Sequence, residues 1–217
     1  MPSSGVPVQG VLFDLDGTLI DSYAAIADSL NYALEAAGRS ALPADEVRRM
    51  VGRGLESLLS DALDGQEVEQ GVRRFRERYA QIYACHTHVL PGVAETVRTL
   101  ARRGYRMGVA SNKPARFGRP ILERLGLAPP LQEILGPDLV EHPKPHPAMV
   151  QRLLELLQLE PAQVVYVGDM PVDVETCRNA EIPCWLVPTG SATLEELESA
   201  GGDRVLLHFS DLLDLLP

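Results

Sequence analysis

Cysteine is scarce in this chain of 217 residues, which contains only Cys85, Cys177 and Cys184. No two of them form a Cys-x-x-Cys pair and their number is odd, so the pattern does not suit a disulfide framework. Free thiols of this kind suit a reducing compartment, where each is expected to pack as a small buried apolar side chain. We therefore expect a cytoplasmic protein.

Long apolar runs are also missing. No window approaches ~18 consecutive apolar residues, the length needed to cross a bilayer, so we expect no membrane-spanning helix. Residues 1–6 are polar and short, with no Lys or Arg before an apolar stretch, so we expect no secretory signal peptide.

Positive charge is in deficit: 20 Lys and Arg stand against 30 Asp and Glu, a formal net charge of −10. This balance argues against general nucleic-acid binding, which needs a basic surface stripe. It does not exclude a small anionic substrate, because a few cations in a cleft outweigh a diffuse negative surface. No apolar stripe stands out as an interface, so both a monomer and a homodimer remain open.

Strand and helix patterns divide the chain into two kinds of sequence. An apolar run from Val8 to Phe13 predicts a strand buried on both faces, and residues 20–87 then show helical periodicity without a convincing strand. From Leu90 onward the two patterns alternate, with strands expected at 105–110, 134–135, 164–167, 183–187 and 205–207. This order predicts an α/β fold, a Rossmann-like parallel sheet with helices on both faces and an inserted all-α helical cap. The core domain would span residues 1–19 and 88–217, and the cap domain residues 20–87.

Two carboxylates end the first predicted strand, Asp14 and Asp16, and Gly17 follows them. An unpaired buried charge is costly, so Asp has no packing role at this position. In open α/β sheets the carboxyl ends of the strands are where ligands bind. Two carboxylates on one face of a strand indicate a cation site, although a solvated turn explains these residues alone equally well.

Three other positions near strand ends carry polar residues that packing does not explain. Ser111 and Asn112 precede a helix start, a suitable place for an anion. Lys144 lies between two prolines that restrict its backbone, and Asp169 with Asp173 repeats the carboxylate pattern. Taken alone, Ser111 and Asn112 are explained by a helix cap, Lys144 by a surface loop and Asp169 by a common turn. The occurrence of all these residues near strand ends indicates one site for a phosphate and a cation.

This set of residues resembles the four motifs of the haloacid dehalogenase-like hydrolase superfamily, and the helical insertion lies where that family has its type 1 cap. The motifs in this chain are Asp14-x-Asp16-Gly17-Thr18, Ser111-Asn112, Lys144 and Gly168-Asp169-x-x-x-Asp173. Leu19-Ile20-Asp21-Ser22 and Val51-Gly52-Arg53-Gly54 resemble the phosphoglycolate phosphatase branch.

The resemblance implies a Mg²⁺-dependent phosphatase for a small phosphorylated metabolite. Asp14 would be the nucleophile that forms an aspartyl-phosphate, and Asp16 would protonate the leaving alcohol and later activate water. Mg²⁺ would be held by Asp14, by the backbone carbonyl of Asp16 and by Asp169, with Asp173 fixing a water or supporting the other ligands.

Residues implied to bind the substrate come from the core and from the cap. Ser111, Asn112 and Lys144 would bind the phosphoryl oxygens. Thr18 would also bind the substrate. Arg53 lies between two glycines of the cap and is the candidate that would reach the part of the substrate beyond the phosphate.

Other reactions of the same superfamily are weighed against this one. Asp16, Asp169 and Asp173 favour phosphoryl transfer over dehalogenation, and Gly168 before Asp169 favours hydrolysis over a phosphomutase. The most favoured substrate is 2-phosphoglycolate. The alternatives within the superfamily are a phosphatase for a sugar phosphate or an amino-sugar 6-phosphate, a pyrophosphatase and a phosphomutase. The alternative from another class is a catalytically silent binding module.

The chain departs from the family pattern at two positions. Met170 follows Asp169 where Ser or Thr is usual, and Glu181 stands where Gly is usual after Ala180. We expect the helix before Glu181 to end in a different way from that of the relatives.

Overall fold

The computed structural model describes residues 6–217, so most of the segment that bears on the signal-peptide expectation lies outside the described residues. Its centre is a six-stranded sheet in the order β5–β4–β1–β6–β7–β8, in which every neighbouring pair is parallel. The strands are β1 (Gly10–Phe13), β4 (Arg106–Ala110), β5 (Glu133–Leu135), β6 (Val164–Gly168), β7 (Cys184–Leu186) and β8 (Arg204–Val205).

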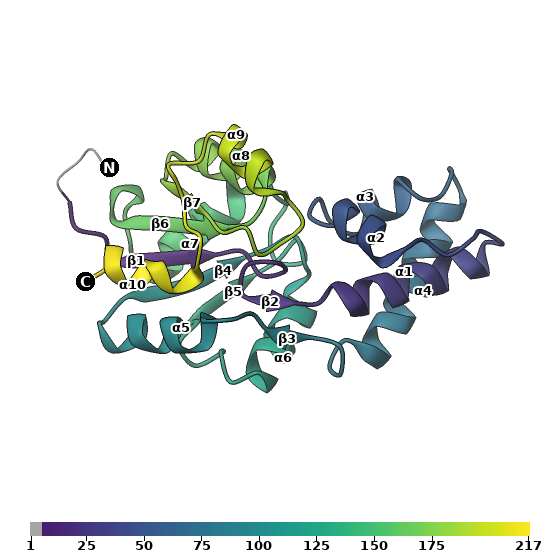
Figure 1. The fold of residues 1–217 in the computed structure, drawn as a ribbon, viewed down its shortest axis with the longest axis horizontal. Coiled ribbons are helices and arrows are strands. Elements are labelled where there is room, and N and C mark those ends of the chain that lie inside the picture. Colours follow the sequence, from purple (N-terminus) through teal and green to yellow (C-terminus); the bar gives the residue numbers. More distant parts are fainter. Residues whose placement is uncertain (1–5) are drawn as a thin grey trace.

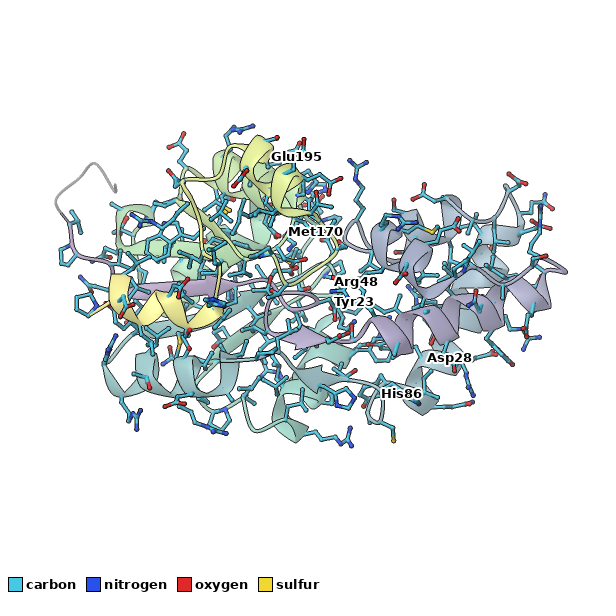
Figure 2. All side chains as sticks on the ribbon, viewed as in Figure 1. Tyr23, Asp28, Arg48, His86, Met170 and Glu195 are labelled. Atoms are coloured by element: carbon cyan, nitrogen blue, oxygen red, sulfur yellow. The ribbon has the colours of Figure 1, made fainter. Side chains whose placement is uncertain are left out.

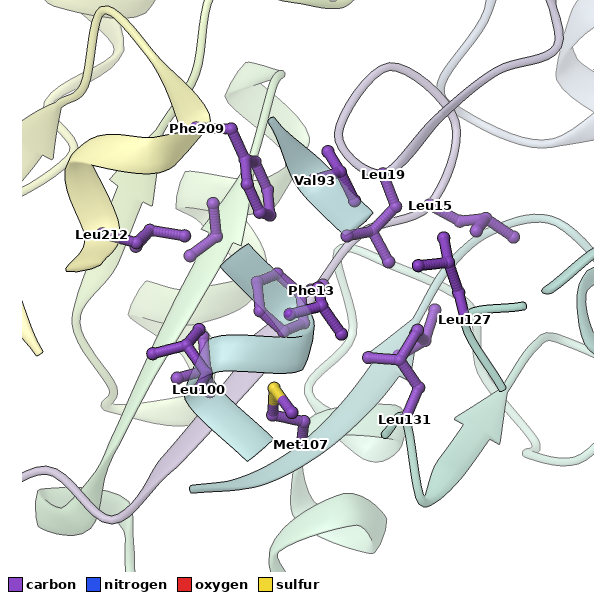
Figure 3. Close-up of a cluster of buried hydrophobic side chains, with 14 of the residues drawn as sticks. Phe13, Leu15, Leu19, Val93, Leu100, Met107, Leu127, Leu131, Phe209 and Leu212 are labelled. Atoms are coloured by element: carbon purple, nitrogen blue, oxygen red, sulfur yellow. The ribbon is translucent and has the colours of Figure 1, made fainter. Parts of the chain in front are cut away.

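Helices cover both faces of this sheet (Figure 1). They are α5 (Val93–Arg102), α6 (Ala115–Arg124), α7 (Ala148–Leu157), α8 (Pro171–Ala180), α9 (Leu194–Ala200) and α10 (Leu212–Leu215), with 3₁₀ turns at Pro161–Gln163 and Phe209–Asp211. Alternation along β1 places Val11 and Phe13 in one apolar cluster with α5, α6 and α10. Leu12 lies in the other, with α7, α8 and α9. Figure 3 shows Phe13 in the first of these clusters. The two clusters together confirm the predicted parallel sheet with helices on both faces.

Four helices form a separate lobe at one side of the sheet (Figure 1). They are α1 (Tyr23–Ala36), α2 (Ala44–Met50), α3 (Leu55–Ser60) and α4 (Glu67–Ile82). The lobe has its own apolar cluster, in which Leu30, Leu59 and Phe75 are buried. We call these four helices, with the loops that join them, the cap. Phe117, on α6, packs against the same cluster from the core side.

The chain enters and leaves the cap through two short strands that the sequence did not predict. β2 (Ile20–Asp21) pairs antiparallel with β3 (His88–Val89), with Ile20 opposite Val89 and Asp21 opposite His88. The prediction of no strand in residues 20–87 is therefore wrong at Ile20 and Asp21. Two residues carry too little alternation to be recognised.

Three smaller details also differ from the sequence predictions. Helix α9 was not predicted, because Leu197 is its only buried residue and gives no apolar period. Cys85 is exposed, contrary to the expectation that all three thiols are buried, whereas Cys177 and Cys184 are buried. Helix α8 ends at Glu181 in the left-handed conformation, with φ 56°, so the helix closes in a glycine-like geometry despite the substitution.

Membrane-spanning segments were not expected. Within residues 6–217 no helix combines the length and the apolar character required to cross a bilayer.

Candidate active site

Three neighbouring strands bring the polar residues of the sequence motifs together. β4, β1 and β6 lie side by side and run parallel, so their carboxyl ends meet at one edge of the sheet. Asp14 follows β1, Ser111 follows β4 and Asp169 follows β6. A backbone hydrogen bond of 2.9 Å from the Asp14 N–H to the Val167 carbonyl fixes Asp14 beside β6.

Three buried carboxylates form one cluster at this edge: Asp14, Asp169 and Asp173 each offer an oxygen within 4.8 Å of the others. Thr18 donates a hydrogen bond of 2.7 Å to Oδ1 of Asp169, while Oδ2 of Asp169 is buried and has no hydrogen-bond partner within residues 6–217. Burial, followed by the charges of Asp14 and Asp173, raises the pKa of Asp169 well above its usual range. Clustered carboxylate oxygens with one left unpaired fit a divalent cation, which takes oxygen ligands.

Asp173 has fewer free lone pairs than the other two carboxylates. Its Oδ1 accepts a hydrogen bond of 2.7 Å from Lys144, and its Oδ2 accepts bonds of 3.1 Å from the backbone N–H groups of Asp169 and Met170. Gly168 leaves room for this arrangement, because a Cβ there would lie 2.4 Å from the Asp173 carboxylate. These bonds favour a role in which Asp173 orients the other groups around the cation.

Lys144 is the cation at the centre of the cluster and is 3% exposed. Its Nζ lies 2.8 Å from Oδ1 of Asp14 and 2.7 Å from Oδ1 of Asp173. It also donates a hydrogen bond of 3.1 Å to the hydroxyl of Tyr166, which donates in turn to the Ala110 carbonyl. Burial lowers the pKa of Lys144, but the two carboxylates outweigh burial and the net shift is upward. Lys144 is therefore a fixed positive charge beside Asp14.

Asn112 holds the backbone of Lys144 in place. Its Nδ2 donates to the Lys144 carbonyl at 3.2 Å and its Oδ1 accepts from the Lys144 N–H at 2.9 Å. The same Nδ2 lies 3.1 Å from the carbonyl of Gly52 in the cap. The amide side chain is thus a positioning group, which leaves the backbone near Asn112 to meet an anion.

Ser111 is 3% exposed, and its Oγ accepts a hydrogen bond of 3.3 Å from the Lys113 N–H. Because Oγ acts as the acceptor in that bond, its own O–H can donate to an anion beside Asp14.

Asp16 lies apart from the three-carboxylate cluster, on the side that faces the cap. Its Oδ1 accepts a hydrogen bond from the Ser22 hydroxyl, and its Oδ2 pairs with Lys113 at 2.7 Å. Burial lowers the pKa of Lys113, but Asp16 and Tyr79 outweigh burial and raise it overall. The sequence analysis gave Lys113 no role, although it follows the Ser111-Asn112 motif directly. The Asp16 side chain thus lies outside the three-carboxylate cluster, and its roles in proton transfer and, through its backbone, in metal binding stay predictions.

Three residues predicted to bind substrate do not line the cavity above Asp14: Thr18, Arg53 and Lys144, of which Lys144 lies against Asp14. Thr18 is fully buried and its hydroxyl is bonded to Asp169, so it supports a carboxylate of the cluster. Arg53 is exposed and does not line the cavity, whereas its neighbours Gly52 and Gly54 do. Their contact with substrate stays a prediction.

A contact between cap and core, which the sequence did not reveal, lies close to the carboxylates. Arg48 of α2 donates hydrogen bonds of 3.0–3.2 Å to the carbonyls of Thr189 and Gly190, and its guanidinium lies 4.3 Å from the centre of the Tyr23 ring. Gly190 packs so tightly on Asp169 that a Cβ would lie 1.6 Å from Oδ2. Figure 2 shows Arg48 and Tyr23 where the two parts of the molecule meet. No sequence signal distinguishes Arg48 from the other arginines of the cap.

Met170, one of the two departures from the family pattern, lies at the same boundary (Figure 2). Its side chain packs on Gly52 of the cap, where a Cβ would lie 2.1 Å from the sulfur. Met170 therefore serves a cap contact in place of the missing hydroxyl.

The cluster as a whole can perform nucleophilic chemistry on an anion. Asp14 is a buried carboxylate that lines the cavity beside a fixed Lys. Ser111 can donate to an anion there, and Asp16 offers a second carboxylate nearby. Phosphoryl transfer requires a positioned nucleophile and charge neutralisation, which is the combination found here.

Comparisons with known proteins agree with this geometry. The family model described as haloacid dehalogenase-like hydrolase matches residues 11–187. A phosphoglycolate phosphatase of Rhodospirillum rubrum is 35% identical over 219 residues, covering 96% of this chain and 90% of its own. A plasmid-encoded phosphoglycolate phosphatase of Cupriavidus necator is 33% identical and covers 100% of this chain and 95% of its own.

Solved structures show the same fold. A crystal structure of a predicted phosphoglycolate phosphatase from Haemophilus somnus superimposes with a TM-score of 0.90 at 27% identity, covering 97% of this chain and 98% of the other.

Proposed function

Because the chain belongs to the haloacid dehalogenase-like hydrolases, in the branch of the phosphoglycolate phosphatases, we propose that it is a Mg²⁺-dependent phosphatase of a small phosphomonoester. The preferred substrate is 2-phosphoglycolate, which yields glycolate and phosphate. The observation that carries the proposal is Asp14, held 2.8 Å from Lys144 in a cluster with Asp169 and Asp173.

The first chemical step uses Asp14 and Asp16. A carboxylate oxygen of Asp14 forms a bond to phosphorus while the bond from phosphorus to the alcohol oxygen breaks. Asp16 donates a proton to that oxygen, so that the alcohol leaves neutral. Lys144 and Ser111 hold the remaining phosphoryl oxygens, and Lys113 balances the charge that Asp16 acquires.

The second step removes phosphate from Asp14. Asp16 takes a proton from a water molecule, whose oxygen bonds to phosphorus as the bond to Asp14 breaks. Inorganic phosphate leaves, and both carboxylates return to their starting state. The helical cap limits the access of bulk water to the aspartyl-phosphate.

Mg²⁺ would be held by the carboxylates of Asp14 and Asp169, with the backbone carbonyl of Asp16, and would neutralise charge on the phosphoryl group. The unpaired Oδ2 of Asp169 and the three buried carboxylates support this assignment. Lys144 alone does not balance three negative charges, which is the reason to expect a divalent cation.

A panel of substrates tests the proposal. We expect phosphate release from 2-phosphoglycolate in Mg²⁺ and its loss in a chelator, with lower kcat/KM for glucose 6-phosphate, glucosamine 6-phosphate and pyrophosphate. Asp14→Asn should lower kcat by roughly three orders of magnitude or more, because it removes the nucleophile. Asp45→Asn, at an exposed position of the cap, is the matched control.

Two results would contradict the proposal. Activity that survives the chelator or Asp14→Asn would exclude the mechanism. A wild-type protein that releases no phosphate from any of these compounds, or from 4-nitrophenyl phosphate, would favour the silent binding module.

A further inference from the structure

The cavity above Asp14 has mainly apolar walls. Its floor is polar and is formed by Asp14, Asp16, Ser111, Asn112 and Lys113, and the cap and the start of α6 supply the rest. The apolar lining includes Ile26, Leu55, Leu58, Phe75 and Phe117. These walls surround the position that the leaving group of a bound phosphomonoester would occupy.

Two polar groups in this lining have no partner. Nε of Arg76 and the hydroxyl of Tyr79 are buried and make no hydrogen bond within the described part of the chain. Both residues belong to α4 and are three positions apart, so they lie on the same face of the helix. Buried donors are rarely left unpaired in folded proteins, so this pair points to an acceptor supplied by a ligand.

The position of each group is fixed from outside the cavity. Nη2 of Arg76 pairs with Glu56 at 2.9 Å on the exposed side of the cap, which leaves Nε for the interior. Tyr79 is 2% exposed and packs edge-on against Phe117, with ring centres 5.3 Å apart. Lys113 and Ser22 lie beside the Tyr79 hydroxyl, but both of them already donate to Asp16, so neither supplies an acceptor for the Tyr79 O–H.

We propose that Arg76 and Tyr79 bind a carboxylate at the end of the leaving group, which makes them specificity residues for phosphorylated hydroxy acids. The inference rests on the proposed phosphatase function and goes beyond it by assigning the substrate contact within the cap. A guanidinium N–H and a phenol O–H both donate, and a carboxylate accepts from both. Arg76 takes the role that the sequence suggested for Arg53.

The same walls disfavour a sugar as leaving group. A hexose would place several hydroxyls against the apolar lining of Leu58, Phe75 and Phe117, whose side chains offer no hydrogen-bond partner. In a hydroxy acid, the short carbon chain would contact the apolar lining, and the carboxylate would accept hydrogen bonds from Arg76 and Tyr79. The geometry thus separates hydroxy-acid phosphates from the sugar phosphates.

The test compares a substrate that has a carboxylate with one that lacks it. For Arg76→Gln we expect the ratio of kcat/KM for 2-phosphoglycolate to that for 4-nitrophenyl phosphate to fall by roughly 10- to 100-fold, mainly through KM, because a charge-assisted hydrogen bond is lost. Tyr79→Phe should lower the same ratio by roughly 3- to 10-fold. Arg76→Lys should restore part of the loss, because it keeps the positive charge.

Arg73→Gln is the matched control, since Arg73 lies on the same helix but is exposed and paired with Glu69. Thermal unfolding of each variant shows whether the cap is folded. Equal losses on both substrates, no change in the ratio, or a wild-type preference for a hexose phosphate would overturn the inference. The first two outcomes leave the proposed phosphatase function intact, and the third changes its preferred substrate but not its chemistry. The phosphatase function itself fails if activity survives the chelator or Asp14→Asn, or if no phosphate is released.

Discussion

Asp14, Asp169 and Asp173 each offer an oxygen within 4.8 Å of the others, and Lys144 is the one cation of residues 6–217 that pairs with this cluster. Such a cluster destabilises the folded chain, because like charges repel strongly where water is excluded. A divalent cation removes that repulsion. The residues that make the site active are therefore expected to lower the stability of the metal-free protein.

Asp169→Asn tests this balance of charge. The amide keeps an oxygen for the Thr18 hydroxyl and removes one negative charge, so the metal-free protein should gain about 1 kcal/mol or more. For a chain of this length that is a rise of roughly 2–4 °C in Tm, measured in chelator by calorimetry. Mg²⁺ should raise the Tm of the wild type but not that of the variant, which should be inactive.

Asp45→Asn serves as the control, since it removes an exposed carboxylate on α2 that does not belong to the cluster. A lower Tm for Asp169→Asn in chelator would show that the hydrogen bonds of the aspartate outweigh its repulsion from Asp14 and Asp173.

The sequence predicted those site residues whose type conflicts with their position. Asp14 and Asp169 stand out because a charge at the end of a buried strand has no packing role, and Lys144 because two prolines hold it. Tyr166, Tyr79 and Arg76 could not be recognised. An aromatic residue in a strand or on the apolar face of a helix is also typical of a core, and Arg76 is one of several arginines on α4.

Among the secondary-structure elements, α2 and α4 each make a contact between the cap and the active site. α4 supplies part of the wall of the cavity, and α2 supplies Arg48, which donates to the carbonyls of Thr189 and Gly190. Because Gly190 packs on Asp169, this contact connects the position of a cap helix to that of a cluster carboxylate.

Arg48→Ala should weaken catalysis more than folding. Loss of the hydrogen bonds to Thr189 and Gly190 is expected to lower kcat/KM for 2-phosphoglycolate by roughly 5- to 30-fold, the equivalent of about 1–2 kcal/mol. Arg49→Ala is the control, because Arg49 is the next residue and is exposed. Steady-state kinetics and thermal unfolding, both measured on each variant, distinguish an effect on catalysis from an effect on stability. An unchanged kcat/KM would show that the contact does not influence the site.

Long, periodic elements were predictable and short ones were not. The strand β6 and the helix α4 carry enough residues to show a period of 2 or 3.6. β2 and β3 are set by tertiary pairing alone, since two residues have no period of their own. The αL closure at Glu181 was also beyond prediction, because tertiary packing tolerates a non-glycine residue there.

For the whole molecule, the pairing of β2 with β3 brings the two ends of the cap segment side by side. Replacing residues 22–87 by Asn-Gly would join Asp21 to His88 through a two-residue hairpin loop. We expect this shortened chain to fold, because both core clusters form without cap residues apart from a peripheral contact by Tyr83. It should lose its preference for 2-phosphoglycolate over 4-nitrophenyl phosphate.

Circular dichroism and thermal unfolding show whether the shortened chain folds cooperatively. Asp14→Asn in the shortened chain is the control that shows whether its remaining phosphatase activity depends on the nucleophile. The predicted core of residues 1–19 and 88–217 and the predicted cap of residues 20–87 are tested by the same experiment. A shortened chain without cooperative unfolding would show that these bounds do not separate independent units.

The antiparallel pair of β2 and β3 also has a consequence for how such a protein can change. Every side chain proposed to take part in the reaction precedes Ile20 or follows Ala110, and the specificity residues lie on one uninterrupted stretch of the gene. A cap segment from a relative can therefore be spliced in at two adjacent points without altering the encoded chemistry. Selection for a new substrate can act on that segment while the reaction is inherited unchanged.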